Sequence, residues 1–114
     1  MLKSLLSEVS AVDGLVSCGL FGRDGLLLDS TGSSADVETW ATQIARMGDS
    51  SREMARDLEL GEFECITVLG SEGTCICWEL ANRGRLVVVL SKHTNLGEIR
   101  RTVRERLERI SSLI

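Results

Sequence analysis

The chain contains no proline, and its 11 glycines are scattered along 114 residues instead of forming a tract. This distribution argues against a disordered linker or a low-complexity tail. No apolar run approaches the roughly 20 residues that a membrane-spanning helix needs. Met1 to Gly14 mixes acids and serines with its leucines, unlike the apolar core of a signal peptide. We therefore expect a cytoplasmic protein with no integral membrane contact.

Sequence motifs for nucleotide binding and catalysis are also missing. Gly19, Gly22 and Gly25 do not match the dinucleotide-binding pattern, and no Gly-Lys-Ser/Thr is present. The single histidine, His93, has no evident partner for acid–base catalysis. The net charge of −4 predicts no strong attraction to nucleic acid. We expect a protein that is not an enzyme and that has no catalytic residues, no cofactor and no nucleic-acid partner.

The four cysteines leave two interpretations open. Cys75 and Cys77 are two residues apart, so on a strand they face the same way, and Cys65 could lie opposite them on a neighbouring strand. A metal or redox site would use such a group. However, the chain has no Cys-x-x-Cys, and free cysteine is a common small core residue. We favour buried reduced thiols, with Cys18 as the fourth, and no metal site.

The apolar pattern predicts a single domain over residues 1–114, with 43% hydrophobic and 26% charged residues. Apolar spacing and turn residues define its elements. In chain order we expect a helix over residues 2–9, strands over 15–21 and 26–28, a helix over about 35–60, strands over 64–69, 74–80 and 85–91, and a helix over 96–114. The fold class is α+β, a five-stranded antiparallel sheet with helices on both faces.

Two segments carry most of this prediction. Residues 86–90 are continuously apolar, which indicates a central strand buried on both faces. The long helix has capping residues in Ser33 to Asp36, Gly61 as its expected C-cap, and an apolar stripe over about half of its circumference. One sheet surface rarely covers so wide a stripe, so we expect this helix to pack on a second surface as well.

Four segments, in this order and spacing, resemble the Roadblock (dynein light chain) family, whose fold is profilin-like. They are Leu5-Leu6-x-x-Val9-x-x-Val12-x-Gly14-Leu15, Arg23-Asp24-Gly25-Leu26-Leu27-Leu28-Asp29-Ser30, Leu60-Gly61 and Asn95-Leu96-Gly97-x-Ile99-Arg100. The short, stand-alone form is most similar to the prokaryotic branch, including the mutual gliding protein B type.

The resemblance implies a homodimer in which the third strands pair edge to edge and the long helices lie side by side. It also implies a role in signalling, cell polarity or motility, as a regulator or scaffold of a Ras-like small GTPase, with GTPase activation as one form of that role. An adaptor that tethers a cargo or signalling complex without affecting nucleotide turnover is the alternative. An arginine inserted in trans, from Arg23, Arg46 or Arg52, is a further possibility that the family does not require.

The small and apolar positions of the long helix and of the third strand are the predicted dimer contacts. They are Ala41, Ile44, Ala45, Gly48, Ser51, Glu64, Ile66 and Val68. The predicted partner-binding residues lie on the remaining side of the helix and are Trp40, Gln43, Arg46, Met47, Ser50 and Glu53. Trp40 and Met47 have core packing as their alternative, and the arginines of the last helix are interpreted as a solvated face.

Overall fold

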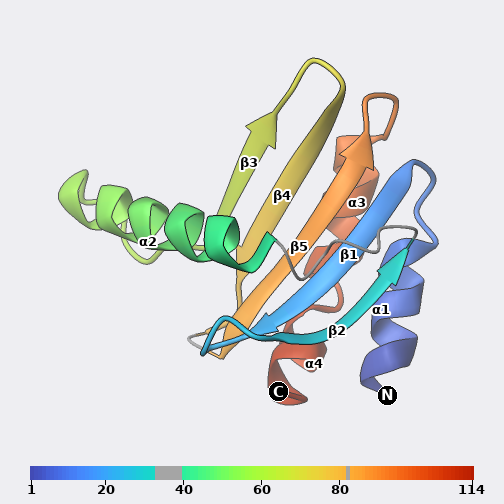
Figure 1. The fold of residues 1–114 in the computed structure, drawn as a ribbon, viewed down its shortest axis with the longest axis horizontal. Coiled ribbons are helices and arrows are strands. Elements are labelled where there is room, and N and C mark those ends of the chain that lie inside the picture. Colours follow the sequence, from blue (N-terminus) through green and yellow to red (C-terminus); the bar gives the residue numbers. More distant parts are fainter. Residues whose placement is uncertain (33–39, 82) are drawn as a thin grey trace.

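The computed structural model describes residues 1–32, 40–81 and 83–114 of the chain. The described residues form one antiparallel sheet with helices on both of its faces (Figure 1). The elements are α1 Leu2–Ser10, β1 Leu15–Gly22, β2 Leu27–Gly32, α2 Ala41–Asp57, β3 Cys65–Leu69, β4 Gly73–Glu79, β5 Gly84–Ser91, α3 Leu96–Arg104 and α4 Leu107–Ser112. The predicted fold class is confirmed.

The strand order is β2-β1-β5-β4-β3, so β5 is central and β2 and β3 are the two edges. β5 pairs with β1 on one side and with β4 on the other, both antiparallel. Val87 and Val88 are fully buried although they face opposite sides of the sheet, which confirms the prediction from the continuous apolar run. The expected position of the third strand at an edge is also confirmed.

The two faces of the sheet are covered unequally. Against α1, α3 and α4 lies the larger core, which includes Leu6, Leu20, Val88 and Ile99. The face toward α2 has a small buried cluster, which consists of Phe21, Ile44, Cys77 and Val87 among the described residues. In Figure 1, α2 lies over the β4 side of the sheet, and its far end continues past β3, beyond the sheet. Among the described residues, α2 therefore covers only part of this face.

The long helix ends earlier than predicted, and Gly61 is not its C-cap. Helix α2 ends at Asp57, and Glu59 takes the left-handed conformation with a φ of 56°. The Leu60 N–H donates to the Ala55 carbonyl at 2.8 Å, and the Glu59 N–H donates to the Arg56 carbonyl at 3.1 Å. These are the two bonds of a Schellman motif, which usually has glycine at the position that Glu59 occupies. The predicted start of the helix and its capping residues lie outside the described residues.

The last helix is broken, whereas the sequence predicted one continuous helix. The Arg106 N–H bonds to the Val103 carbonyl, three residues back, at 2.9 Å. The Thr102 carbonyl, which a continuous helix would pair with that N–H, accepts instead from Nη1 of Arg106 at 2.9 Å. Nε of Arg106 also contacts Glu8 of α1 at 2.8 Å. The side chain thus takes the place of a helical backbone bond and ties the break to α1.

Candidate protein-interaction surfaces

Both β3 and the end of α2 that extends past it carry exposed apolar side chains. Val68 and Leu69 of β3 are 49% and 71% exposed. Met54 of α2 is 59% exposed, and Leu58, the residue that caps this helix, is 61% exposed. Because an edge strand also presents unpaired backbone groups, β3 combines apolar side chains with a template for pairing. We call Met54, Leu58, Val68 and Leu69 the apolar edge.

The predicted dimer contacts on α2 divide into two groups. Ile44 is only 5% exposed and packs on the sheet of its own chain, with Ala41 against the same cluster. Gly48 is buried as well. Ile44 and Gly48 therefore keep little surface for a second copy, and their assignment as dimer contacts stays a prediction. Ala45 and Ser51 are half-buried, and their place in an interface stays a prediction.

On β3, and at Glu64 directly before it, the predicted contacts keep accessible surface. Glu64 is exposed, Ile66 is half-buried near the α2 cluster, and Val68 lies farther along the edge. Met54 and Leu58 are not among the predicted contacts, because the predicted contacts on the helix lie at the centre and the small flank of its apolar stripe. Leu69 lies one residue beyond the predicted contacts of the third strand. Their common signal was apolar character at the two elements expected to meet a second copy.

The predicted partner-binding residues also divide into two groups. Gln43, Arg46, Ser50 and Glu53 are exposed on α2. Trp40 and Met47 are half-buried and pack against the cluster under α2. The core alternative therefore describes Trp40 and Met47 better than a fully exposed contact does, and the four polar residues are the ones accessible to a partner.

An ion-pair network that the sequence analysis did not identify holds α2 on the sheet. Arg85 of β5 and Glu79 of β4 are 14% and 10% exposed in their side chains, and Nε of Arg85 lies 3.2 Å from Oε2 of Glu79. Arg85 also reaches the Ile44 carbonyl at 3.5 Å and Oδ1 of Asp49 at 3.6 Å, both on α2. Oε2 of Glu79 in turn receives Nη2 of Arg52 at 3.0 Å. Each buried charge thus has a partner, as burial requires.

This network explains why a glycine occupies position 48. A Cβ at this position would overlap the guanidinium of Arg85. The glycine therefore makes room for a buried arginine of its own chain. Arg52, a residue considered for insertion into a partner, is already paired with Glu79. A polar pocket of about 310 Å³ opens beside the network and reaches the β1–β2 hairpin at Arg23 and Asp24.

The cysteines do not form a common site. Cys77 pairs with Ile66 and Cys75 with Val68, whereas Cys65 pairs with Trp78. Cys65 therefore projects from the opposite face to Cys75 and Cys77, and the expectation that it could lie opposite them is wrong. Burial raises the pKa of the Cys18 and Cys77 thiols to about 12. Within residues 1–32, 40–81 and 83–114, no three His, Cys, Asp or Glu side chains are placed to hold a metal ion.

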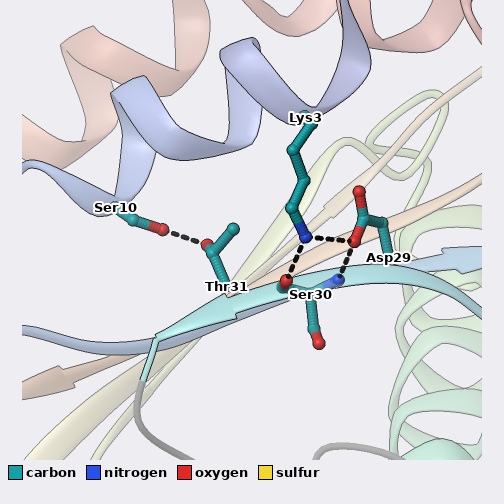
Figure 2. Close-up of polar contacts among 5 residues, drawn as sticks. All are labelled: Lys3, Ser10, Asp29, Ser30 and Thr31. Atoms are coloured by element: carbon teal, nitrogen blue, oxygen red, sulfur yellow. Dashed lines mark hydrogen bonds and ion pairs between the residues drawn. The ribbon is translucent and has the colours of Figure 1, made fainter.

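A second group of contacts, also missed from the sequence, joins α1 to the edge strand β2 (Figure 2). Nζ of Lys3 lies 2.9 Å from Oδ1 of Asp29 and donates to the Ser30 carbonyl at 3.2 Å. The Ser30 N–H donates to the same Asp29 carboxylate at 2.8 Å. Lys3 lowers the pKa of the Asp29 carboxyl because its ammonium stabilises the charged form. At the last residue of α1, the hydroxyl of Ser10 is hydrogen-bonded to that of Thr31.

None of the helices in the described part of the chain is both long and apolar enough to cross a bilayer. The curated proteins similar to this chain include two uncharacterized proteins of Methanocaldococcus jannaschii, MJ1340 and MJ0310. MJ1340 is 26% identical over 114 residues and MJ0310 is 25% identical over 114 residues. In both cases the match covers 99% of this chain and 99% of the relative.

Solved structures share the fold at low sequence identity. Myxococcus xanthus MglB matches with a TM-score of 0.89 at 17% identity, covering 98% of this chain and 93% of that chain. The gliding protein mglB from Thermus thermophilus matches at 0.88 with 19% identity, over 98% and 87%. A Roadblock/LC7 domain from Streptomyces avermitilis matches at 0.85 with 15% identity, over 96% and 94%.

The family model for the Roadblock/LC7 domain matches residues 1–90, which is most of the chain. Its match includes strands β1 to β4, helix α2 and nearly all of the central strand β5. The chain belongs to the Roadblock/LC7 domain family.

Proposed function

We propose that this protein is a homodimeric, non-enzymatic regulator or scaffold of a Ras-like small GTPase in the cytoplasm. The observation that carries the dimer is the apolar edge. Two consecutive elements, α2 and β3, carry exposed apolar side chains, and β3 is an open edge of the sheet. The GTPase partner rests on the resemblance to the prokaryotic Roadblock proteins, and the exposed polar side of α2 is the surface offered to it.

A second copy related by a two-fold axis meets the needs of the apolar edge. Antiparallel pairing of β3 with β3 of a second copy covers the open β3 edge of each copy in one step. The projecting end of α2 would then lie over the sheet of the partner copy, on the face that one α2 covers only in part. Val68, Met54 and Leu58 would be buried by the same event, which favours association through the hydrophobic effect.

Regulation of the GTPase would proceed by binding. The thiols with a pKa of about 12 are protonated near neutral pH and make poor nucleophiles. Arg52 is held by Glu79 at 3.0 Å, so it is not poised for insertion into a partner. Gln43, Arg46, Ser50 and Glu53 would contact the GTPase and shift the position of its own switch residues. This mode requires no catalytic group from the present chain.

The pairing of Arg52 also favours the alternative function, an adaptor that binds its partner without changing nucleotide turnover. The two functions share the same dimer and the same α2 surface. They differ in one measurement, the rate of GTP hydrolysis by a bound Ras-like GTPase with and without this protein. A changed rate supports the regulator. An unchanged rate in the presence of measured binding supports the adaptor.

The dimer is tested by Val68→Lys. Each copy would bury an unpaired ammonium at the interface, which costs several kcal/mol, so self-association should weaken by roughly a hundredfold or more. The fold should survive because Val68 is already half exposed. Leu26→Lys is the matched control, since Leu26 is exposed at the far hairpin of the sheet. The oligomeric state of both variants is measured by sedimentation equilibrium. An unchanged dimer for Val68→Lys would refute the assignment of the β3 edge as the dimer interface.

A further inference from the structure

The two edges of the sheet are treated differently. In β2, both backbone polar groups of one residue, Ser30, are hydrogen-bonded to side chains. Its carbonyl accepts from Lys3 at 3.2 Å, and its N–H donates to Asp29 at 2.8 Å. Lys3 and Asp29 are themselves joined at 2.9 Å. We call these three residues the β2 clasp. Among the contacts of the described residues, none occupies the N–H and carbonyl of one β3 residue in this way.

The clasp occupies the groups that a new strand would use. The N–H and C=O of one strand residue point to the same side, and successive residues alternate between the neighbouring strand and the open edge. Both groups of Ser30 are bonded to side chains, which places them on the outer side of β2, away from β1. Asp29 and Thr31 flank Ser30 and both contact α1, through Lys3 and Ser10 respectively.

We propose that the β2 clasp guards this edge against pairing with a second copy of the chain, and so stops assembly at the dimer formed through β3. The inference rests on the proposed dimer. Natural sheets protect free edges with charged side chains, and lysine is the most frequent choice. Here the lysine comes from a helix, α1, and takes up a backbone acceptor directly.

Among possible pairing strands, β2 of a second copy fits the geometry of the open β2 edge best. In a hydrogen-bonded antiparallel pair, the two opposed residues exchange both N–H···O bonds. Two copies of Ser30 across a two-fold axis would therefore satisfy each other completely once the clasp opens. A sheet with self-pairing edges at both β3 and β2 would have no end, because each added dimer would present another open β2. Closure of one edge is what limits such a ribbon to two copies.

The test compares the unaltered chain with the double variant Lys3→Met, Asp29→Ala. The double variant frees both groups of Ser30, so its mass in sedimentation equilibrium should rise above that of a dimer with increasing concentration. The matched control is Lys92→Met, which removes another surface ion pair, to Glu72 at 3.5 Å, and should remain a dimer. A double variant that stays dimeric at every concentration overturns the proposal.

Ser30→Pro added to the double variant identifies the surface involved. Proline removes the outward N–H without removing a bond to β1, so the mass should return to that of a dimer. Continued growth of the assembly would show that a different surface associates, which also overturns the proposal. Amide hydrogen exchange gives a local readout at a concentration where the double variant is still a dimer. The Ser30 amide, which has lost its contact with Asp29 and has not yet paired with a second copy, should there exchange roughly fivefold faster than in the unaltered chain.

The same design separates failure of the guard from failure of the β3 dimer. If the unaltered chain sediments as a monomer, the proposed dimer is wrong. The guard then predicts that Lys3→Met, Asp29→Ala converts the monomer to a dimer. In the Val68→Lys background, which closes the β3 edge, the double variant should likewise reach two copies and no more. A monomer in that background refutes the guard.

Discussion

Replacing Gly48 with alanine should destabilise the protein, although alanine is the better helix former. In an exposed helix interior, Gly→Ala contributes about 1 kcal/mol of stability. At this position the new methyl group would overlap the guanidinium of Arg85. Arg85 would have to leave Oε2 of Glu79, now 3.2 Å away, and its contacts with α2. Whether Gly48→Ala stabilises or destabilises the protein thus depends on the buried side chain of Arg85 in β5.

The magnitude follows from two opposing contributions. A hydrogen bond between charged groups contributes about 1.5–3 kcal/mol, and Glu79 would retain Arg52 as a partner, so we take roughly 2 kcal/mol as the loss. Subtracting the gain in helix propensity leaves a net destabilisation of about 1 kcal/mol. With Arg85→Ala already in place, nothing overlaps the methyl group, and Gly48→Ala should stabilise by about 1 kcal/mol. The predicted coupling energy is therefore about 2 kcal/mol.

A double-mutant cycle measured by chemical denaturation checks this prediction. All four chains are compared at one protein concentration, because self-association contributes to apparent stability. Ser50→Ala is the control, since Ser50 is exposed on the same helix and should give a similar small gain with or without Arg85. If Gly48→Ala stabilises the chain that retains Arg85, the guanidinium moves aside freely and the reasoning is refuted.

Two further predictions concern the end of α2 and the thiols. Glu59→Gly should stabilise by about 0.5–1 kcal/mol in thermal or chemical unfolding, because Glu59 has a φ of 56° at a position that favours glycine; Glu62→Gly should give no gain, and equal gains would contradict the cause. With a thiol reagent at pH 8, exposed Cys65 should react first, whereas Cys18 and Cys77 should react only on unfolding, because a pKa of about 12 leaves about one thiolate in ten thousand. Fast labelling of Cys77 in the folded protein would show that its burial is wrong.

The order of elements was predictable because each carries a local signal. Residues 86–90 indicate a central strand by continuous apolarity, and the glycine-containing loops indicate the hairpins. The elements could then be arranged because short connections between strands favour antiparallel neighbours. The edge position of β3 followed in the same way and through the family resemblance. These signals lie within a few residues of one another, so a single sequence displays them.

The features that were missed join residues far apart in the chain. Lys3 and Asp29 are separated by 26 positions, and Arg85 lies 41 positions from the Ile44 carbonyl that it contacts. No periodicity relates such pairs. The break at Arg106 was hidden for a different reason, since the apolar spacing continues through it while one side chain replaces a backbone bond. The end of α2 was misplaced because a glutamate takes the position usually held by glycine.

The buried network under α2 also bears on the proposed interface. Met54 lies six residues beyond Gly48, about 9 Å along the helix axis at 1.5 Å per residue. A tilt of about 10° at the point where Arg85 meets α2 would therefore move Met54 by roughly 1.6 Å. Packed interfaces are sensitive to displacements of this size.

Gly48 was predicted as a dimer contact, and in the structure it is covered by its own chain. We expect it to influence the dimer all the same, by allowing Arg85 to set the angle at which the projecting end of α2 meets a second copy. In sedimentation, Gly48→Ala should then weaken self-association even though it changes no exposed side chain, and unaltered dimer affinity would show that the angle is set elsewhere.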